Sequence, residues 1–409
     1  MAFEIDPESF HNDRTSDINI KVVGVGSFGC RSLNHIIEKK LAKAEFISVH
    51  TDPRALEDSR APVIVLVGHQ FMNEKKSKKS VSSGSRSRFS IGDDDRQKIA
   101  TQLQGADLII LVAGMGKGTS TTLTPAVALA ARNLGILTIG LVILPFACEG
   151  KAKVIAAEEG ITELRKYVDT LIVLDSDRIF SSAEAGTTVS DAFSLPNEVV
   201  YRAIKGMADI LTHKGHIKVS FDDVAELMSG AGDAIIATAS AYGDGSALQA
   251  VMEALRSLQA DSESIEHAKG VLVNITGEVT MKDLSEAMAF LEHEVGSDTQ
   301  IINGYIDEPT ETGEARALLI ATGLTRKLFV QPMYGIARAG KNSFPERPLA
   351  PNPGKEPDYK TPAFIRRKIF IKALDENPLL NGSTLSRKDR INKSRPDEPA
   401  FLRLISDNF

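Results

Sequence analysis

Short apolar runs alternate, through the first half of the chain, with stretches in which apolar residues recur every three or four positions. The runs are rich in β-branched residues and predict buried strands, whereas the wider spacing predicts helices, the first of them at Leu33, Ile36, Ile37 and Leu41. Strands that alternate with helices predict a doubly wound α/β sheet with ligand-binding loops at the carboxyl ends of its strands. The predicted strands are Ile18–Val25, Phe46–Val49, Val63–Val67, Leu108–Val112 and Leu137–Ile143.

Two glycine-rich turns each separate a predicted strand from a predicted helix. In such a turn, backbone N–H groups and the positive end of the helix dipole point at one place, a geometry that suits a phosphate. Glycines needed only for a tight turn would give the same pattern, so one turn alone is a weak indication. The first turn holds Gly24, Gly26 and Gly29; the second holds Gly114, Gly116 and Gly118 and leads through Thr119–Thr124 into a helix expected at Pro125–Leu134.

The first turn also matches the G-x-G-x-x-G pattern of dinucleotide-binding enzymes, and Asp52 follows it at the spacing of their ribose-binding carboxylate. A nicotinamide- or flavin-dependent enzyme is therefore an alternative. Two glycine turns on one sheet, however, fit a mononucleotide held from both sides better than one dinucleotide. A P-loop is not predicted, because Lys117 is followed by Gly118 and no glycine stands five residues before Gly116.

Composition narrows the class of protein. The 409 residues are 42% hydrophobic and 25% charged, which is enough for two domains with cores. No apolar run approaches the roughly 20 residues that cross a bilayer, and the first residues do not resemble a signal peptide. Cys30 and Cys148 alone form neither a disulfide framework nor a metal site. The lack of a membrane span or signal peptide and the two cysteines favour the cytoplasm, and the formal net charge of −6 argues against general nucleic-acid binding.

The rest of the chain changes character twice. The residues from Lys75 to Arg88 include six basic side chains and no acidic one, which predicts a flexible basic insert. From about Thr325 the sequence is proline-rich and polar, as in a linker. Between these segments we expect an α+β domain with strands at Ile235–Ser240, Val271–Ile275, Gln300–Ile306 and Ala315–Thr322, and helices at Ala247–Leu258 and after an N-cap at Thr280.

Seven segments of the chain, in order, resemble the bacterial tubulin-like division GTPase family FtsZ. The resemblance spans about residues 18 to 325 and is specific, because the segments agree in order. It lowers the weight of the dinucleotide alternative and implies a tubulin/FtsZ-like fold. The segments are IKVVGVGSFG, FISVHTDPRAL, ADLIILVAGMGKGTST, LPFACEG, VDTLIVLDSDRI, VSDAFSLPNEVV and KVSFDDVAELM.

The resemblance implies a GTP/GDP site, with Mg²⁺ as a companion ion. Phe193 would stack on the base and Asn197 would read its edge, while Lys153 and Ser176 replace an arginine and an asparagine of the family. Ser27 and Phe28 stand at positions that the family fills with glycine or asparagine, so we expect weakened affinity. The implied nucleotide-binding residues are Gly24, Gly26, Gly29, Asp52, Gly114, Gly116, Lys117, Gly118, Thr119, Ser120, Thr121, Pro145, Glu149, Lys153, Ser176, Phe193 and Asn197.

Hydrolysis in this family occurs between subunits, where a loop of the form N-x-D-x-x-D enters the neighbouring site. Here the loop has Lys218 and Ser220 in place of the asparagine and the first aspartate, which leaves Asp222 and Asp223 as the catalytic candidates. Loss of one positioning carboxylate costs roughly 10²–10⁴-fold in rate. We therefore expect weakened or absent GTP hydrolysis.

The resemblance also implies a domain order and partners. We expect a divergent FtsZ paralogue that forms filaments at the septal ring; the alternative is a non-hydrolysing scaffold or regulator that co-assembles with a motif-complete FtsZ. The family's tail peptide resembles two segments, around Phe364 and Phe401, which would bind membrane tethers or division proteins. The expected segments are an N-terminal extension at 1–17, a GTP-binding domain at 18–195 with the basic insert at 75–93, a central helix at 196–213, an activation domain at 214–325, and a linker and tail at 326–409.

Overall fold

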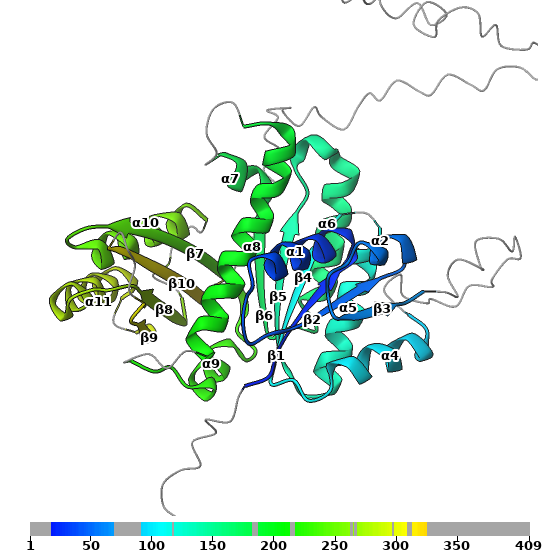
Figure 1. Cartoon of the computed structure of the whole chain (residues 1–409), viewed down its shortest axis with the longest axis horizontal. Helices are drawn as coiled ribbons and strands as arrows, with labels where there is room; N and C mark the ends of the chain where they lie inside the picture. Colours follow the sequence, from blue (N-terminus) through cyan, green and yellow to red (C-terminus); the bar gives the residue numbers. More distant parts are fainter. Residues whose placement is uncertain are drawn as a thin grey trace, which may run out of the picture. The chain divides into compact units, whose positions relative to one another are not determined.

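The described strands form one ten-stranded sheet in the order β3-β2-β1-β4-β5-β6-β7-β10-β8-β9 (Figure 1). The first six are parallel, in the strand order of doubly wound nucleotide-binding folds. The computed structural model describes residues 18–68, 91–116, 118–181, 187–212, 217–261, 265, 268–296, 298–308 and 313–324. The strands are β1 Ile20–Val25, β2 Glu45–His50, β3 Val63–Leu66, β4 Leu108–Gly114, β5 Leu137–Leu144, β6 Thr170–Asp175, β7 Gly232–Tyr242, β8 Gly270–Thr276, β9 Gln300–Ile306 and β10 Glu314–Leu324.

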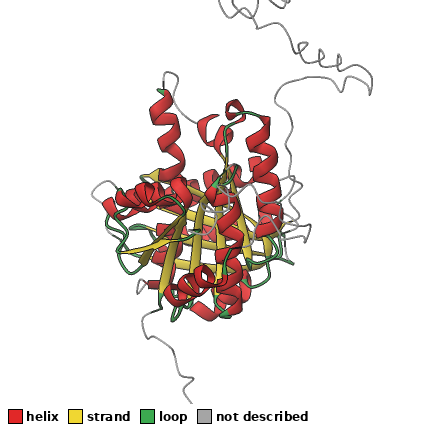
Figure 2. Cartoon of the chain, turned by 90° about the vertical axis from the view of Figure 1, so that its right-hand side faces the viewer, coloured by secondary structure: helices red, strands yellow, loops and turns green. Residues whose placement is uncertain are grey.

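Helices lie on both sides of the sheet (Figure 2). Packing clusters place α1, α8 and α9 on one face of the parallel strands and α4, α5 and α6 on the other, while α10 and α11 pack on the second half of the sheet. The helices are α1 Gly26–Glu38, α2 Pro53–Glu57, α4 Asp93–Leu103, α5 Thr119–Asn133, α6 Lys151–Leu164, α7 Ser176–Ser181, α8 Val189–Thr212, α9 Phe221–Met228, α10 Ser246–Asp261 and α11 Met281–Val295, with a short 3₁₀ turn, η2, at Ala147–Glu149.

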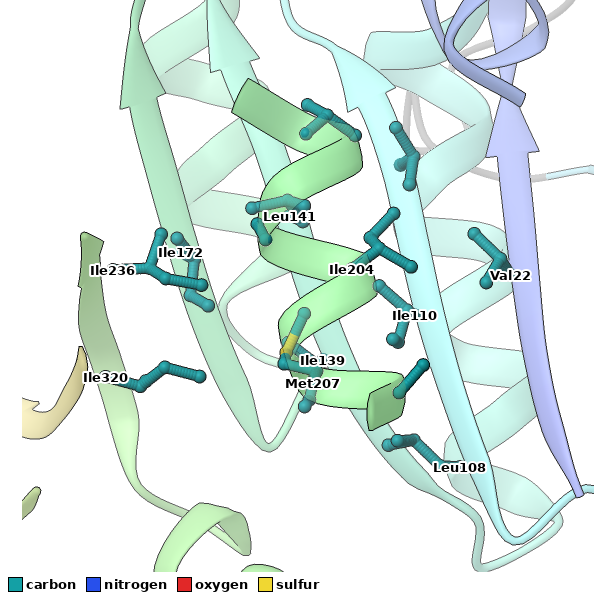
Figure 3. Packing of buried hydrophobic residues seen from close by; sticks show 14 of the residues in the cluster. Val22, Leu108, Ile110, Ile139, Leu141, Ile172, Ile204, Met207, Ile236 and Ile320 are labelled. Atoms are coloured by element: carbon teal, nitrogen blue, oxygen red, sulfur yellow. The ribbon is translucent and has the colours of Figure 1, made fainter. Parts of the chain in front are cut away.

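Strand β4 is buried on both faces, which explains its unbroken apolar sequence. Leu108 and Ile110 belong to the cluster under α8, whereas Ile109 and Leu111 belong to the cluster under α5. Figure 3 shows Ile204 of α8 beside Ile110 in the first of these clusters. The centre of the sheet is therefore a rigid support for the turns at its carboxyl edge.

Three predicted helix starts are wrong. Helix α1 begins at Gly26, within the first glycine turn, and ends before Leu41; α5 begins at Thr119 rather than Pro125; α8 begins at Val189 rather than near residue 196. The reason in the first two cases is a single glycine with positive φ, +74° at Gly26 and +100° at Gly118, which reverses the chain in one residue. The turns are therefore shorter than the glycine spacing suggested.

Several predicted segments lie outside the described residues. These are the N-terminal extension at 1–17, residues 75–90 of the basic insert, Lys117, and the linker and tail at 326–409 with both tail peptides. Ile91 is buried in the core, so the predicted end of the insert at residue 93 falls within the packed structure. In the part of the chain that is described, no helix is long and apolar enough to cross a membrane.

Candidate functional site

Three helices start side by side at the carboxyl edge of the sheet. Helices α1, α5 and α6 follow the neighbouring strands β1, β4 and β5. Among the described residues, none caps these three starts with a side chain, and their first turns contain no acidic residue. The first N–H groups of a helix need partners, and together with the helix dipole they attract an anion. The arrangement is suited to a phosphate chain.

The glycines of the first turn bring α1 against β4 and α5. A Cβ atom added to Gly26 would lie 2.7 Å from Ser120 Cβ, and one added to Gly29 would lie 2.4 Å from the carbonyl oxygen of Val112. Gly114 is covered by Phe28, whose Cβ would lie 2.8 Å from an added Cβ. Phe28 is partly buried against the core, so part of its bulk is taken up by packing. These glycines are needed for close approach whether or not a ligand binds.

The second turn is held by hydroxyl groups from the first turn of α5. Thr121 Oγ1 accepts the Gly116 N–H at 3.0 Å and donates to the Gly116 carbonyl at 2.7 Å. Ser120 Oγ donates to the Gly114 carbonyl. Both side chains are buried, and their hydroxyls hold the shape of this turn. Their part in nucleotide binding stays a prediction.

The segment after β5 forms the opposite wall. Gly116 lies against Pro145 and Lys153, since an added Cβ would be 3.9 and 3.7 Å from their side chains. Glu149 accepts the Phe146 N–H at 3.0 Å and the Lys153 ammonium at 2.6 Å. The ammonium group of Lys153 is therefore held by a carboxylate beside the glycine turn. Ser176, at the start of α7, donates to the carbonyl of Leu144 at the end of β5.

Helix α8 contributes an aromatic ring and an amide. Phe193 is 45% exposed, and its ring centroid lies 4.8 Å from that of Phe146. One turn further on, Asn197 Oδ1 accepts a hydrogen bond of 2.8 Å from Ser32, a buried residue of α1. This bond fixes the direction of the Asn197 amide. An exposed ring beside an oriented amide can stack on a base and read its edge.

An ionic cluster joins α8 to α1 next to Asn197. Glu198 accepts hydrogen bonds from His35 at 3.0 Å and Arg202 at 3.1 Å, and lies 3.3 Å from Lys39. Burial raises the pKa of Glu198, but these hydrogen bonds outweigh it and bring the pKa below its ordinary value. The cluster keeps the two helices in register at the site.

The sequence interpretation missed two residues at the end of β2, because their contacts are with distant parts of the chain. His50 Nε2 lies 3.1 Å from Ser27 Oγ in α1, and Thr51 Oγ1 lies 2.6 Å from Thr119 Oγ1 in α5. Asp52, expected near a ribose, accepts the Arg54 N–H at 3.0 Å and caps α2. Burial lowers the pKa of His50, and Asp52 opposes that shift.

The catalytic candidates lie at the other end of the sheet. Asp222 and Asp223 are exposed in the first turn of α9, which packs near the amino ends of the strands: the Thr170 hydroxyl, at the start of β6, donates to the Met228 carbonyl. Asp223 and Ser220 form a capping box, each accepting the other's backbone N–H. A six-residue strand spans about 20 Å, so these carboxylates do not reach the glycine turns of their own chain.

A cleft of about 260 Å³ lies elsewhere, between α8 and the polar faces of β7, β8 and β10. Two of its cations are paired with anions that also line it, Lys205 with Asp209 and Arg202 with Glu198. Asn274 Oδ1, which is buried there, has no hydrogen-bond partner among the described residues. The cleft lacks helix starts and glycine turns, so the phosphate-binding geometry belongs to the other site.

The strand order, the glycine turns and the uncapped helix starts define a nucleotide-binding α/β protein. Residues 19–184 match the GTPase domain of the Tubulin/FtsZ family, and residues 232–325 match the C-terminal domain of the FtsZ family. The chain belongs to the Tubulin/FtsZ family. Among the described residues, no group of three or more His, Cys, Asp or Glu side chains could hold a metal ion.

Individual relatives agree with this assignment. The chain is 34% identical over 317 residues to the cell division protein FtsZ of Magnetospirillum gryphiswaldense, covering 76% of this chain and 55% of that protein. It therefore spans about half the length of this curated relative. Among solved structures, an FtsZ point mutant and an empty FtsZ dimer, both from M. jannaschii, each have a TM-score of 0.67. They are 27% and 28% identical to the chain and are covered to 92% and 89%, with 76% of this chain matched in each case.

Proposed function

We propose that this chain is a divergent FtsZ-like protein of cell division that binds GTP and GDP and assembles into filaments. It acts in the cytoplasm, at the septal ring on the inner face of the membrane. The observation that carries the proposal is the meeting of three uncapped helix starts with the Phe193 ring and the oriented Asn197 amide. Family membership supplies the guanine preference, and the empty FtsZ dimer of M. jannaschii supports self-assembly.

The geometry supports the following assignment of the parts of the nucleotide to residues. The starts of α1, α5 and α6 bind the phosphates through backbone N–H groups, with Lys117 adding a positive charge from the second turn. Phe193 stacks on the base and Asn197 hydrogen-bonds its edge. Mg²⁺, which accompanies nucleoside triphosphates by binding phosphate oxygens and water, needs few protein ligands. That coordination is compatible with the scarcity of carboxylate clusters among the described residues.

Titration with a fluorescent GTP analogue tests the binding. We expect saturable binding, displaced by GTP and GDP but far less by ATP; equal displacement by ATP would contradict the guanine preference. Phe193→Ala should weaken binding about 10-fold or more, as loss of a base-stacking ring does. Phe180→Ala is the matched control, because Phe180 is similarly exposed and also contacts Phe146, but it comes from α7. A larger effect at Phe180 would place the base elsewhere.

We further propose that GTP turnover is weak and takes place between subunits. The loop before α9 is at the wrong end of the sheet to serve its own chain, and Ser220 stands where the family has a carboxylate. The double change Lys218→Asn and Ser220→Asp should raise phosphate release at least 10-fold under filament-forming conditions. Ser220→Asn is the control, because it also caps a helix but adds no carboxylate. No gain over the parent from the double change would locate the defect in the glycine turns.

A second candidate function is a non-hydrolysing scaffold that co-assembles with a motif-complete FtsZ. The capping box favours it, because the Asp223 carboxylate already binds the Ser220 N–H of its own chain. Co-sedimentation with motif-complete FtsZ tests this: incorporation into its polymer without any change in total GTP turnover supports the scaffold. The dinucleotide alternative has no support from the comparisons.

The tail peptides are proposed to recruit membrane tethers or division proteins. Two copies on one chain raise the effective concentration of the second contact, so avidity can exceed either single affinity by roughly 10²–10⁴. Phe364→Ala and Phe401→Ala should each weaken recruitment to a membrane-bound FtsZ tether, and the pair should abolish it. If Phe364→Ala has no effect and Phe401→Ala alone abolishes recruitment, only the second peptide binds.

A further inference from the structure

Three consecutive residues, His50 at the end of β2 and the next two, each contact the start of a different helix. The His50 ring lies 3.1 Å from Ser27 Oγ at the second position of α1. The Thr51 hydroxyl lies 2.6 Å from that of Thr119, the first residue of α5, and the Asp52 carboxylate caps α2. Two of these three helices, α1 and α5, are among the three uncapped starts of the nucleotide site. The segment 50–52 therefore positions the phosphate-binding backbone.

The hydrogen bonds of His50 have one consistent direction. The Asp52 N–H points at Nδ1 over 2.8 Å, so Nδ1 is the acceptor and carries no proton. The neutral ring then has its proton on Nε2, which donates to Ser27 Oγ. His50 is 5% exposed and burial lowers its pKa, which keeps the ring neutral near pH 7.

This direction decides what Ser27 can do. Its oxygen accepts from His50, so its own hydrogen is available to donate elsewhere. Ser27 is exposed, and it lies in a helix start whose first turn contains no acidic residue. A hydroxyl that donates a hydrogen bond from the start of α1 contacts the same ligand as the backbone N–H groups of that helix start. The ligand group that matches these donors is a negatively charged oxygen atom that accepts hydrogen bonds.

We propose that His50 is a positioning residue that orients the Ser27 hydroxyl to donate a hydrogen bond to a phosphate oxygen of the bound guanine nucleotide. The inference rests on the proposed function and adds to it a side-chain donor that the glycine pattern does not contain. The serine in the first turn of α1 then adds a phosphate contact, although it departs from the glycine or asparagine of the family.

Substitution of Ser27 tests the donor. Hydrogen bonds to charged groups are worth about 10- to 100-fold in affinity, so Ser27→Ala should weaken GTP and GDP binding by about 10-fold. Binding of guanosine, which has no phosphate, should be unchanged when measured by calorimetry at high ligand concentration. Ser27 is exposed and alanine is tolerated within a helix, so the variant should unfold at the parent's temperature. Unchanged GTP affinity in Ser27→Ala would overturn the proposal.

Two variants of His50 separate its two contacts. Gln places an amide N–H near the position of Nε2 and can still donate to Ser27, whereas Asn reproduces the Nδ1 acceptor for the Asp52 N–H and loses the donor. His50→Gln should keep GTP affinity within about 3-fold of the parent. His50→Asn should lose nearly as much GTP affinity as Ser27→Ala. The double variant with Ser27→Ala and His50→Asn should lose no more GTP affinity than Ser27→Ala alone.

The outcomes distinguish this inference from the proposed function. If the parent binds no guanine nucleotide, the proposed function fails and this one fails with it. If the parent binds GTP while His50→Gln and His50→Asn lose affinity equally, with equal unfolding temperatures, the orienting role of His50 is wrong and the nucleotide site stands. Additive losses in the double variant would likewise overturn the coupling between the two residues.

Discussion

Helices begin in two different ways in this molecule. At the carboxyl edge of the parallel strands, α1, α5 and α6 start without side-chain caps or acidic residues among the described residues. In the second half, Thr280 caps α11, and Asp283 of α11 accepts N–H groups at the start of α10; at the amino ends of the strands, Ser220 caps α9. A chain that can cap its helices elsewhere has left three neighbouring starts open.

Under the proposed function, the capped starts contribute to stability and the open starts bind a ligand. A side-chain cap contributes about 1 kcal/mol to stability by giving a terminal N–H group a partner. An open start forgoes that contribution and keeps its N–H groups for an anion. Nucleotide binding should therefore be sensitive to charge at the open starts, whereas stability should be sensitive to the caps at the others.

The largest effect should come from placing a carboxylate at an open start. Thr119→Glu adds a negative charge at the first residue of α5, where repulsion of a phosphate at close range costs a factor of about 100 or more in GTP affinity. Met281→Glu makes the same change at the first residue of α11, a capped start, and should leave GTP affinity unchanged. Equilibrium titration of both variants measures the contrast, and equal losses would remove the distinction between the two kinds of start.

Removal of a cap should lower stability and leave GTP affinity unchanged. Thr280→Ala leaves the Asp283 N–H without its hydroxyl partner, which is 3.1 Å away in the parent, and should lower the free energy of unfolding by about 1 kcal/mol. GTP affinity should stay at the parent value. Thr280→Ser retains the hydroxyl and is the control. Denaturant unfolding of the nucleotide-free protein gives the stability, and a parent-like midpoint for Thr280→Ala would show that the cap contributes nothing.

The smallest effect concerns pH at the open starts. Burial lowers the pKa of His50 in the folded state below its ordinary value of about 6.5. The unfolded chain therefore binds the proton first, and stability is lost as pH falls below about 6.5. The parent should lose more stability between pH 7.5 and 5.5 than His50→Gln, with Asp52 reducing the difference. Denaturant unfolding curves of both proteins at the two pH values test this. Identical losses of stability would show that His50 is not the source of the pH dependence.

The sequence predicted the alternation of strands and helices well because β4 and its neighbours β1 and β5 are buried on both faces and are mostly apolar, with Lys21 in β1 and Thr138 in β5 as polar exceptions. The predicted helix starts were less accurate. In each turn a single glycine with positive φ, Gly26 or Gly118, reverses the chain, whereas several glycines were expected to form the turn. Pro125 was expected near a helix start and instead lies inside α5.

The site could be predicted only in part, because several of its contacts join residues that are far apart in the sequence. Phe193 and Asn197 could be named from a resemblance, but the bond from Ser32 that orients Asn197 joins residues 165 positions apart. The contacts of His50 and Thr51 span 23 and 68 positions. No local pattern signals such pairs, since serine, threonine and histidine occur in many turns without them. Asp52 was expected at a ribose; its carboxylate accepts the Arg54 N–H two residues further on and caps α2, and its part at a ribose stays a prediction.

The segment His50-Thr51-Asp52 also constrains how the chain can change in length. Because each residue serves a different helix, an insertion or deletion within these three positions would move every contact to the wrong partner at once. A substitution alters one contact, but a change of length alters all three. Related chains with the same three contacts should therefore differ in length before β2 or after α2, and keep this segment at three residues.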